Sequence, residues 1–87
     1  MPEVEIFTTM LCPFCAAAKR LLECKGIAFT ETDVMFSPGR RREMSERAGG
    51  DHRVPQIFVN GRHIGNCDRL YALDAVGELD SILEDAP

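Results

Sequence analysis

Two cysteines separated by two residues, Cys12 and Cys15, lie between a short apolar run and a helical pattern. Pro13 follows the first cysteine, and a proline at the first helical position already has the backbone angle that a helix requires. We therefore expect Cys12 at the N-cap of a helix. The free N–H groups of the first helical turn and the positive end of the helix dipole favour a thiolate at that position. Because the thiolate is the form that attacks sulfur, this placement predicts that Cys12 is a nucleophile.

The spacing of apolar residues alternates along the chain between the period of a strand and the period of a helix. The resulting order, β-α-β-α-β-β-α, predicts an α/β fold with a four-stranded mixed sheet flanked by helices, in which the first strand is central. The first two strands should be parallel, because a helix joins them. The expected elements are a strand over residues 4–7, a helix from Pro13 that Gly26 ends, a strand over residues 27–34, a helix from Ser37-Pro38 to Ala48, a hairpin over residues 54–65 that turns at Asn60-Gly61, a helix opened by Cys67-Asp68 and a short helix after Gly77.

Several side chains have a predicted environment. On the helical wheel Cys15 lies at the border of the apolar stripe, so it should be less exposed than Cys12. Cys24 lies at the margin of the same stripe, which favours a packed and inert thiol. Asp68 is a good N-cap residue for the helix that follows it. The aromatic residues expected in the core are Phe7, Phe29, Phe58 and Tyr71.

The composition describes a soluble globular protein of one domain, with 87 residues, 45% of them hydrophobic and 28% charged. No apolar run is long enough to span a bilayer and the N-terminus lacks the pattern of a signal peptide, so we expect a cytoplasmic protein with no membrane partner. A net charge of −4 argues against nucleic acid as a partner. Arg40-Arg41-Arg42 is a local basic cluster, which is more often a solvated helix face than a site for an anionic partner.

Four cysteines in a reducing compartment favour redox catalysis or metal binding over structural disulfides. Tetrahedral zinc needs four ligands. Beyond the Cys12/Cys15 pair, the other candidate ligands occur singly in the sequence, and they are Cys24, His52, His63 and Cys67. We therefore favour a redox dithiol and expect no metal site.

Three motifs occur in a fixed order, C-P-F-C at residues 12–15, V-P-Q-I-F-V at residues 54–59 and G-N-C-D at residues 65–68. Together they resemble the glutaredoxins, and among these the small bacterial glutaredoxin-3 type, over nearly the whole chain. The resemblance implies a single glutaredoxin domain over residues 1–87 with the thioredoxin fold. It also implies a monomeric oxidoreductase that reduces glutathione mixed disulfides and protein disulfides. Glutathione is then the co-substrate, no cofactor is tightly bound, and the partners are glutathionylated or disulfide-bonded proteins.

The resemblance also assigns roles to individual residues. Cys12 matches the family's nucleophile and Cys15 its resolving thiol. Val54-Pro55 matches a cis-proline loop in which the Val54 backbone pairs with glutathione, although a trans proline that starts a strand is equally compatible with the sequence. Cys67 and Asp68 match the loop that holds the γ-glutamyl end of glutathione, where Asp68 faces the ammonium group.

The remaining glutathione-binding positions depart from the family pattern. Thr9 stands where many relatives have a lysine, and Phe14 replaces a frequent tyrosine. Arg53 replaces a threonine, and Asn66 replaces the second glycine of a Gly-Gly pair. We expect Arg53 to substitute for the missing lysine if it points into the cleft.

Two other functions remain open. Some members of the family hold an iron–sulfur cluster between two chains, and Pro13 argues against this because those members often have a smaller or more flexible residue there. A thioredoxin-like electron donor recharged by a flavoprotein reductase would be indifferent to glutathione, and the motif around Asp68 argues against that alternative.

Overall fold

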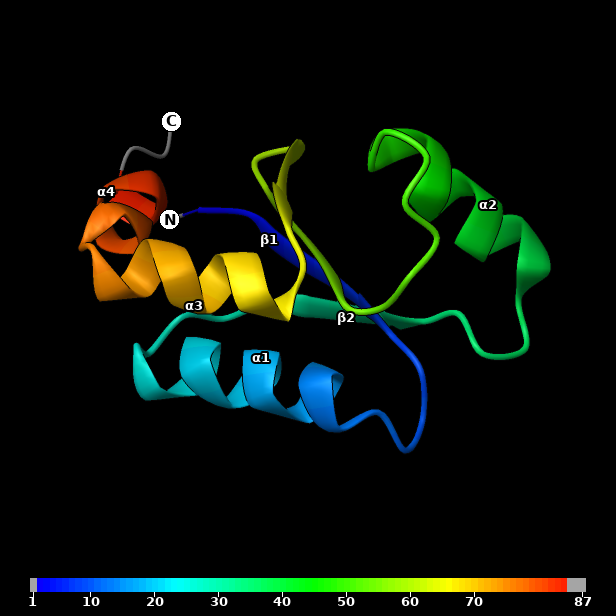
Figure 1. Ribbon diagram of the computed structural model, residues 1–87, viewed down its shortest axis with the longest axis horizontal. Helices are drawn as coiled ribbons and strands as arrows, with labels where there is room; N and C mark the ends of the chain where they lie inside the picture. The colour runs from blue at the N-terminus through cyan, green and yellow to red at the C-terminus, as the bar shows by residue number, and fades with distance from the viewer. Residues whose placement is uncertain (1, 85–87) are drawn as a thin grey trace.

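The computed structural model describes residues 2–84, which form a four-stranded sheet flanked by helices (Figure 1). The order of the strands across the sheet is β2-β1-β3-β4, so that β2 and β4 are outermost. β1 is parallel to β2 and antiparallel to β3, and β3 is antiparallel to β4. The predicted mixed sheet with a central first strand is therefore confirmed. The strands are β1 (Val4–Thr8), β2 (Thr30–Asp33), β3 (Gln56–Val59) and β4 (Arg62–Gly65).

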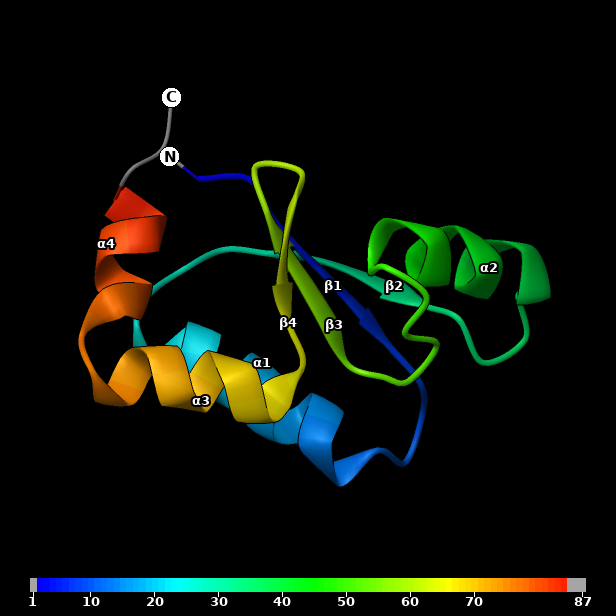
Figure 2. The ribbon, with the colours of Figure 1, turned by 45° about the horizontal axis from the view of Figure 1, so that its top comes forward.

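Helices cover both faces of the sheet. α1 (Pro13–Cys24), α3 (Cys67–Ala75) and α4 (Glu78–Glu84) pack together on one face, whereas α2 (Pro38–Arg47) lies on the other (Figures 1 and 2). The alternation of side chains along a strand explains this division, because successive residues point to opposite faces. Ile57 and Val59 of β3 face α1, α3 and α4, while Phe58 between them faces α2.

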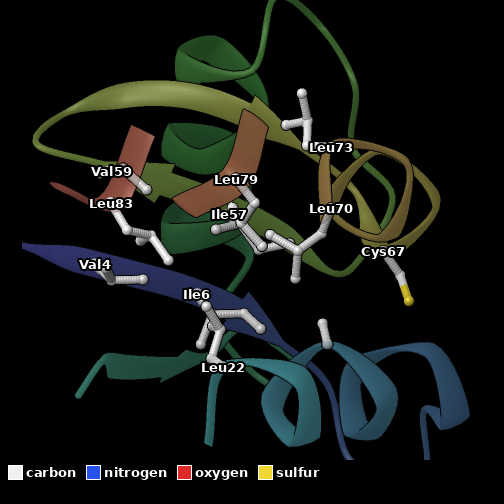
Figure 3. Close-up of a cluster of buried hydrophobic side chains, with 11 residues drawn as sticks. Val4, Ile6, Leu22, Ile57, Val59, Cys67, Leu70, Leu73, Leu79 and Leu83 are labelled. Atoms are coloured by element: carbon white, nitrogen blue, oxygen red, sulfur yellow. The ribbon is translucent and has the colours of Figure 1, made fainter. Parts of the chain in front are cut away.

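The larger core cluster lies between the sheet and three helices (Figure 3). Every helix on that face contributes at least one fully or nearly fully buried side chain, which fixes α1 and α3 side by side. Because both helices begin at the same end of the sheet as the dithiol, this packing brings the Cys12 segment near the start of α3. The cluster consists of Val4, Ile6, Ala18, Leu22, Ile57, Val59, Cys67, Leu70, Leu73, Leu79 and Leu83.

The smaller cluster, beneath α2, is built around Phe58. Its ring is fully buried, and the ring of Phe7 meets it edge-on with centroids 5.5 Å apart. The guanidinium of Arg47 lies 4.2 Å from the centroid of the Phe58 ring and pairs with Glu5 at 2.9 Å. A cation over an aromatic face adds to the burial of the ring. Arg47 therefore joins α2 to the central strand.

Two turns have the geometry that the sequence predicts. Gly26 has a φ of 71°, and its N–H bonds to the Glu23 carbonyl while the Ile27 N–H bonds to the Leu22 carbonyl, which is the helix ending that favours glycine. Asn60 and Gly61, with φ values of 52° and 81°, form the two-residue hairpin turn.

The predicted strand over residues 27–34 is too long, because β2 includes only Thr30–Asp33. The Ile27 N–H is used to close α1, so the chain enters the sheet later. Phe29, which was expected in the core, is only partly buried against it.

Two other predictions of burial are wrong. Tyr71 is 41% exposed, because its hydroxyl donates to the Ala17 carbonyl at 3.0 Å and links α3 to α1 at the surface. Cys24 is exposed at the last position of α1 and is not packed in the core.

The predicted domain range, 1–87, includes residue 1 and residues 85–87, which lie outside the described part of the chain. Within residues 2–84 the longest helix has 12 residues, and none of the helices can serve as a bilayer span.

Candidate active site

Cys12 is the N-cap residue of α1, as predicted, and Pro13 is the first helical residue. The backbone of Cys12 is extended, with φ −105° and ψ 107°, and its carbonyl accepts the first helical hydrogen bond from Ala16 at 3.1 Å. The Cys15 N–H donates to the Cys12 Sγ at 3.2 Å. A donor aimed at this sulfur stabilises negative charge on it.

Cys15 lies one turn into α1 and is buried, with 2% of its surface exposed, whereas Cys12 is half-buried. Burial and, to a smaller extent, the contact with the Cys12 sulfur together raise the pKa of the Cys15 thiol to about 12. Both thiols are free. The predicted asymmetry of exposure between the two cysteines is confirmed.

The difference in burial predicts an order of alkylation. Cys24 is exposed and should react with iodoacetamide well before Cys15, which should react slowly at about pH 7 and about tenfold faster for each pH unit, since its thiolate fraction rises by that factor below its pKa. Timed alkylation followed by mass spectrometry of the four cysteine peptides measures these rates. Labelling of Cys15 as fast as Cys24 near neutral pH would contradict the buried position.

A pocket of about 180 Å³ opens between the start of α1, the loop before β3 and the start of α3. Six of the nine residues that the sequence predicts for the site line this pocket, and Asn66 lines it as well. The predicted residues among them are Phe14, Arg53, Val54, Pro55, Cys67 and Asp68. The structure therefore brings the three sequence motifs to one place.

The other three predicted site residues, Thr9, Cys12 and Cys15, line a second hollow on the side of β2. Thr9 therefore does not line the pocket that contains Arg53 and Asp68. Thr9, which stands where many glutaredoxins have a lysine, therefore lines the second hollow and not the pocket.

Val54 and Pro55 form the wall of the pocket that precedes β3. The peptide bond between them is cis, as the resemblance implied. The pairing of β3 with β1 begins at Gln56, so the Val54 backbone lies beyond the sheet pairing and borders the pocket. An extended ligand can use such a backbone as a strand would.

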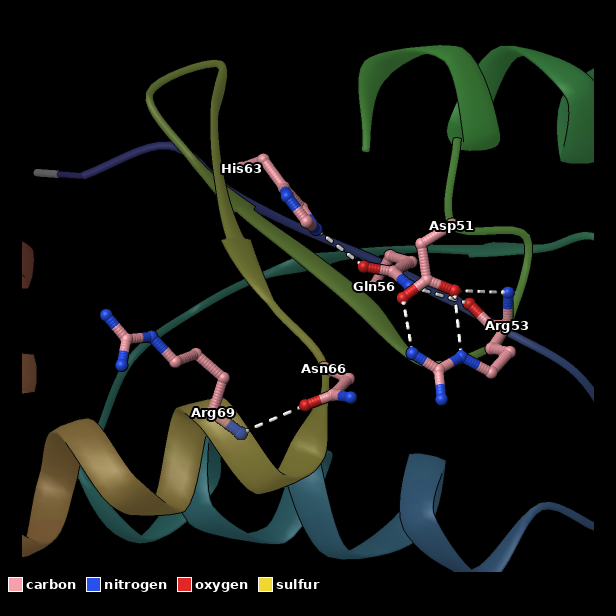
Figure 4. Close-up of polar contacts among 6 residues, drawn as sticks. All are labelled: Asp51, Arg53, Gln56, His63, Asn66 and Arg69. Atoms are coloured by element: carbon pink, nitrogen blue, oxygen red, sulfur yellow. Dashed lines mark hydrogen bonds and ion pairs between the residues drawn. The ribbon is translucent and has the colours of Figure 1, made fainter. Parts of the chain in front are cut away.

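The N-cap of α3 differs from the prediction. Asn66 is the capping residue, since its backbone is extended and its Oδ1 accepts the Arg69 N–H at 3.0 Å (Figure 4). Asp68, which was expected to cap the helix, is already the second helical residue. Its carboxylate is thus free of the capping role and lies exposed in the first turn, on the pocket.

Arg53 is held beside the pocket by Asp51. Its Nε and Nη2 donate to the two Asp51 oxygens, each at 3.0 Å, and this pairing raises the pKa of the Arg53 guanidinium and holds that of the Asp51 carboxyl well below its usual range. Asp68 also contributes to the raised pKa of Arg53. The pocket therefore has one cation and one anion near each other.

Gln56 is a residue that the sequence did not single out. It is fully buried, its Nε2 donates to the Arg53 carbonyl at 2.9 Å, and its Oε1 lies 2.6 Å from Nε2 of His63 (Figure 4). The amide thus fixes the loop that lines the pocket to the neighbouring strand. A polar residue within the apolar V-P-Q-I-F-V run was the signal for this role.

Cys67 lies in the wall of the pocket and is buried. Burial is the main reason that its pKa is raised, and the nearby Asp68 carboxylate acts in the same direction. Among the residues that the structure describes, no cluster of three or more His, Cys, Asp or Glu side chains could hold a metal ion.

Comparison with known proteins places this geometry in a family. The glutaredoxin family model matches residues 4–64. The chain is 49% identical to glutaredoxin 3 of Escherichia coli K12 over 84 residues, which cover 97% of this chain and all of that protein. The solution structure of a glutaredoxin from Brucella melitensis superposes with a TM-score of 0.81 at 49% identity, over 93% of this chain and 87% of that one. The dithiolic glutaredoxin 2-C-Grx1 of Trypanosoma brucei brucei also superposes with a TM-score of 0.81, at 38% identity, over 93% of this chain and 86% of that chain.

Proposed function

The chain belongs to the glutaredoxin family and is a thiol-disulfide oxidoreductase, and we propose that it works with glutathione as co-substrate on glutathione mixed disulfides and protein disulfides. One observation carries the proposal. The N-cap sulfur of Cys12 lies at the start of α1, next to a pocket that has a cation, an anion and a helix N-terminus. Glutathione carries two carboxylates and one ammonium group, which these features match.

In the proposed complex each charged group of glutathione meets an opposite charge. The backbone N–H groups at the start of α3 bind the γ-glutamyl carboxylate, as helix N-termini bind anions. Asp68 faces the ammonium group. Arg53 binds the glycine carboxylate and takes over the role of the lysine that many glutaredoxins have at the position of Thr9. The Val54 backbone pairs with the cysteinyl residue, and Phe14, Pro55 and Cys67 contact the apolar parts of the ligand.

The first half of the proposed reaction uses Cys12 alone. Its thiolate attacks the glutathione sulfur of a mixed disulfide, the Cys12–glutathione disulfide forms, and the substrate sulfur leaves as a thiolate that takes up a proton. A second glutathione thiolate then attacks the bound glutathione sulfur and releases Cys12 as a thiolate. The products are the reduced substrate and glutathione disulfide, so one reduced glutathione is consumed and the glutathionyl group of the substrate becomes the other half of the new disulfide.

A protein disulfide requires the second thiol. Cys12 attacks one substrate sulfur and forms a mixed disulfide, while the other substrate sulfur leaves. Cys15 then loses its proton and attacks the Cys12 sulfur, which forms the Cys12–Cys15 disulfide and releases the second substrate thiol. The short separation along α1, at which the Cys15 N–H already touches the Cys12 sulfur, supports this intramolecular step.

The proposal is tested by steady-state turnover of glutathionylated cysteamine with glutathione as reductant. We expect Asp68→Asn to raise KM for the glutathionylated substrate about tenfold, or about 1.4 kcal/mol, with kcat little changed, because the contact with the ammonium group is made before and during the reaction. Glu78→Gln removes an acidic group from the first turn of α4 and is the matched control. An unchanged KM in Asp68→Asn would remove Asp68 from the glutathione site.

A further inference from the structure

The second hollow beside Cys12 has a volume of about 480 Å³ and lies between the start of α1 and the strand β2. We call it the Leu11 groove. Of the described residues that line the groove and the pocket, none is shared between them. The residues of the groove used below are Met10, Leu11, Cys12, Lys19, Glu31 and Asp33.

Leu11 has two unusual properties for an apolar residue. Its side chain is 96% exposed, and its φ of 57° lies in the left-handed region that non-glycine residues rarely adopt. Unfavourable backbone conformations of this kind are concentrated at functional sites. Since Leu11 directly precedes Cys12, its side chain is presented to whatever approaches the nucleophile.

Exposed apolar side chains also occur on the loop that follows β2. The N–H of Val34 donates to the Thr8 carbonyl at 2.8 Å, so the segments after β1 and after β2 begin next to each other before they separate (Figure 1). Seven large apolar side chains of the described chain are exposed, and five lie in these segments or at the start of α1. These five are Met10, Leu11, Phe14, Met35 and Phe36. Such a concentration marks an interaction surface.

The charges of the groove favour a basic ligand. Glu31 accepts hydrogen bonds from Thr8 at 2.7 Å and from Lys19 at 3.0 Å, so one carboxylate is paired with the ammonium group. Asp33 provides the second carboxylate. Its side chain is exposed, and its Oδ1 accepts a hydrogen bond from the Met35 N–H at 2.8 Å. Two carboxylates against one ammonium group leave the groove with an excess negative charge, which disfavours an anionic tripeptide such as glutathione.

We infer that the Leu11 groove docks the polypeptide segment next to the reactive cysteine of a protein disulfide substrate, with an apolar side chain against Leu11 and a lysine or arginine near Asp33. The inference deepens the proposed function and rests on it. Because Cys12 lines the groove, a substrate docked there presents its sulfur to the nucleophile while the pocket on the other side stays open to glutathione.

The test uses two synthetic cyclic peptides, each closed by one disulfide. In the first, leucine and lysine flank the cysteine, and in the second, serine and glutamate flank it. The dithiol form of the protein, reduced beforehand and freed of reductant, is mixed with each peptide, and the single-turnover rate is followed by quenching and chromatography. We expect the wild-type protein to reduce the leucine and lysine peptide at least about tenfold faster than the other.

Two substitutions remove the proposed contacts with little change to the backbone. Leu11→Asn replaces the apolar side chain by one that tolerates a positive φ, and Asp33→Asn removes the charge but keeps the oxygen that accepts the Met35 N–H. We expect the double variant to reduce the two peptides at rates within about threefold of each other. Val76→Ser, at an exposed apolar residue after α3, is the control and should keep the wild-type preference.

Turnover of glutathionylated cysteamine separates this inference from the proposed function. The double variant should retain wild-type KM and kcat in that assay, and a raised KM would assign the groove to glutathione and overturn the inference. Equal rates on the two peptides in the wild-type protein would also overturn it, as would a preference that survives both substitutions. Absence of glutathione-dependent turnover in the wild-type protein would reject the proposed function alone, since the peptide assay contains no glutathione.

Discussion

Cys12→Ser lowers the turnover of glutathione mixed disulfides and of protein disulfides at least about 1000-fold, because the hydroxyl that replaces the thiol cannot form the covalent intermediate. Cys15→Ser has a selective effect. It keeps the reduction of glutathionylated cysteamine within about threefold of wild type, since glutathione itself resolves the intermediate, and it loses most reduction of protein disulfides. The two assays, run on both variants, measure the separation of roles.

The serine at position 15 preserves the geometry of the site, so the comparison is informative. The contact with the Cys12 sulfur comes from the backbone N–H of residue 15 and is kept in the variant. Cys24→Ser, at an exposed thiol, is the matched control and should resemble wild type in both assays. Activity of Cys12→Ser on glutathionylated cysteamine equal to that of wild type would show that the nucleophile is another residue.

Phe58→Ala should lower the free energy of unfolding by about 3–5 kcal/mol, the usual cost of truncating a buried phenylalanine. The ring is fully buried, and the substitution removes its contacts with the Phe7 ring and with the Arg47 guanidinium. Total stabilities of about 5–15 kcal/mol are usual for domains of this kind, so a large part of the stability is lost. Urea unfolding followed by circular dichroism measures the change.

Phe36→Ala removes the same side chain from a position that is 84% exposed. The free energy of unfolding should then change by less than about 0.5 kcal/mol, as is usual for surface substitutions. Similar losses in the two variants would contradict the distinction between the ring in the core and the ring at the surface.

The periodic segments of the fold could be predicted because local sequence and burial agree there. Ile57, Phe58 and Val59 alternate between two cores, Asn60-Gly61 supplies the two positive φ values of a tight turn, and Gly26 ends α1. The position of Cys12 at the N-cap followed from Pro13 together with the apolar run before it and the helical pattern after it. These features depend on residues that are adjacent in the sequence, and the local sequence pattern is therefore enough to predict them.

The errors occur where the local sequence is compatible with more than one structure. Ile27 is apolar and suits a strand, yet its N–H closes α1. Tyr71 suits a core, but its hydroxyl finds the Ala17 carbonyl at the surface of the neighbouring helix. Asn66 and Asp68 are both good caps, and only the path of the chain out of β4 decides between them.

The candidate site was predictable to different degrees. The residues of the pocket came from the three motifs, but the pairing of Arg53 with Asp51 and the buried amide of Gln56 depend on how the loop before β3 folds back on itself. The Leu11 groove could not be inferred either, because it forms only when the start of α1 and the strand β2, which the rest of α1 and a loop separate in sequence, come together in the fold.

The outermost position of β2 has a consequence for solubility. An unpaired sheet edge invites another chain to add a strand, and here that edge lies beside the Cys12 sulfur. β2 has only four residues, Thr-Glu-Thr-Asp, and its two carboxylates oppose the approach of a second copy of the same strand by charge repulsion. The sheet can thus keep a short unpaired edge next to the Cys12 thiol while it resists the addition of strands from further copies of the protein.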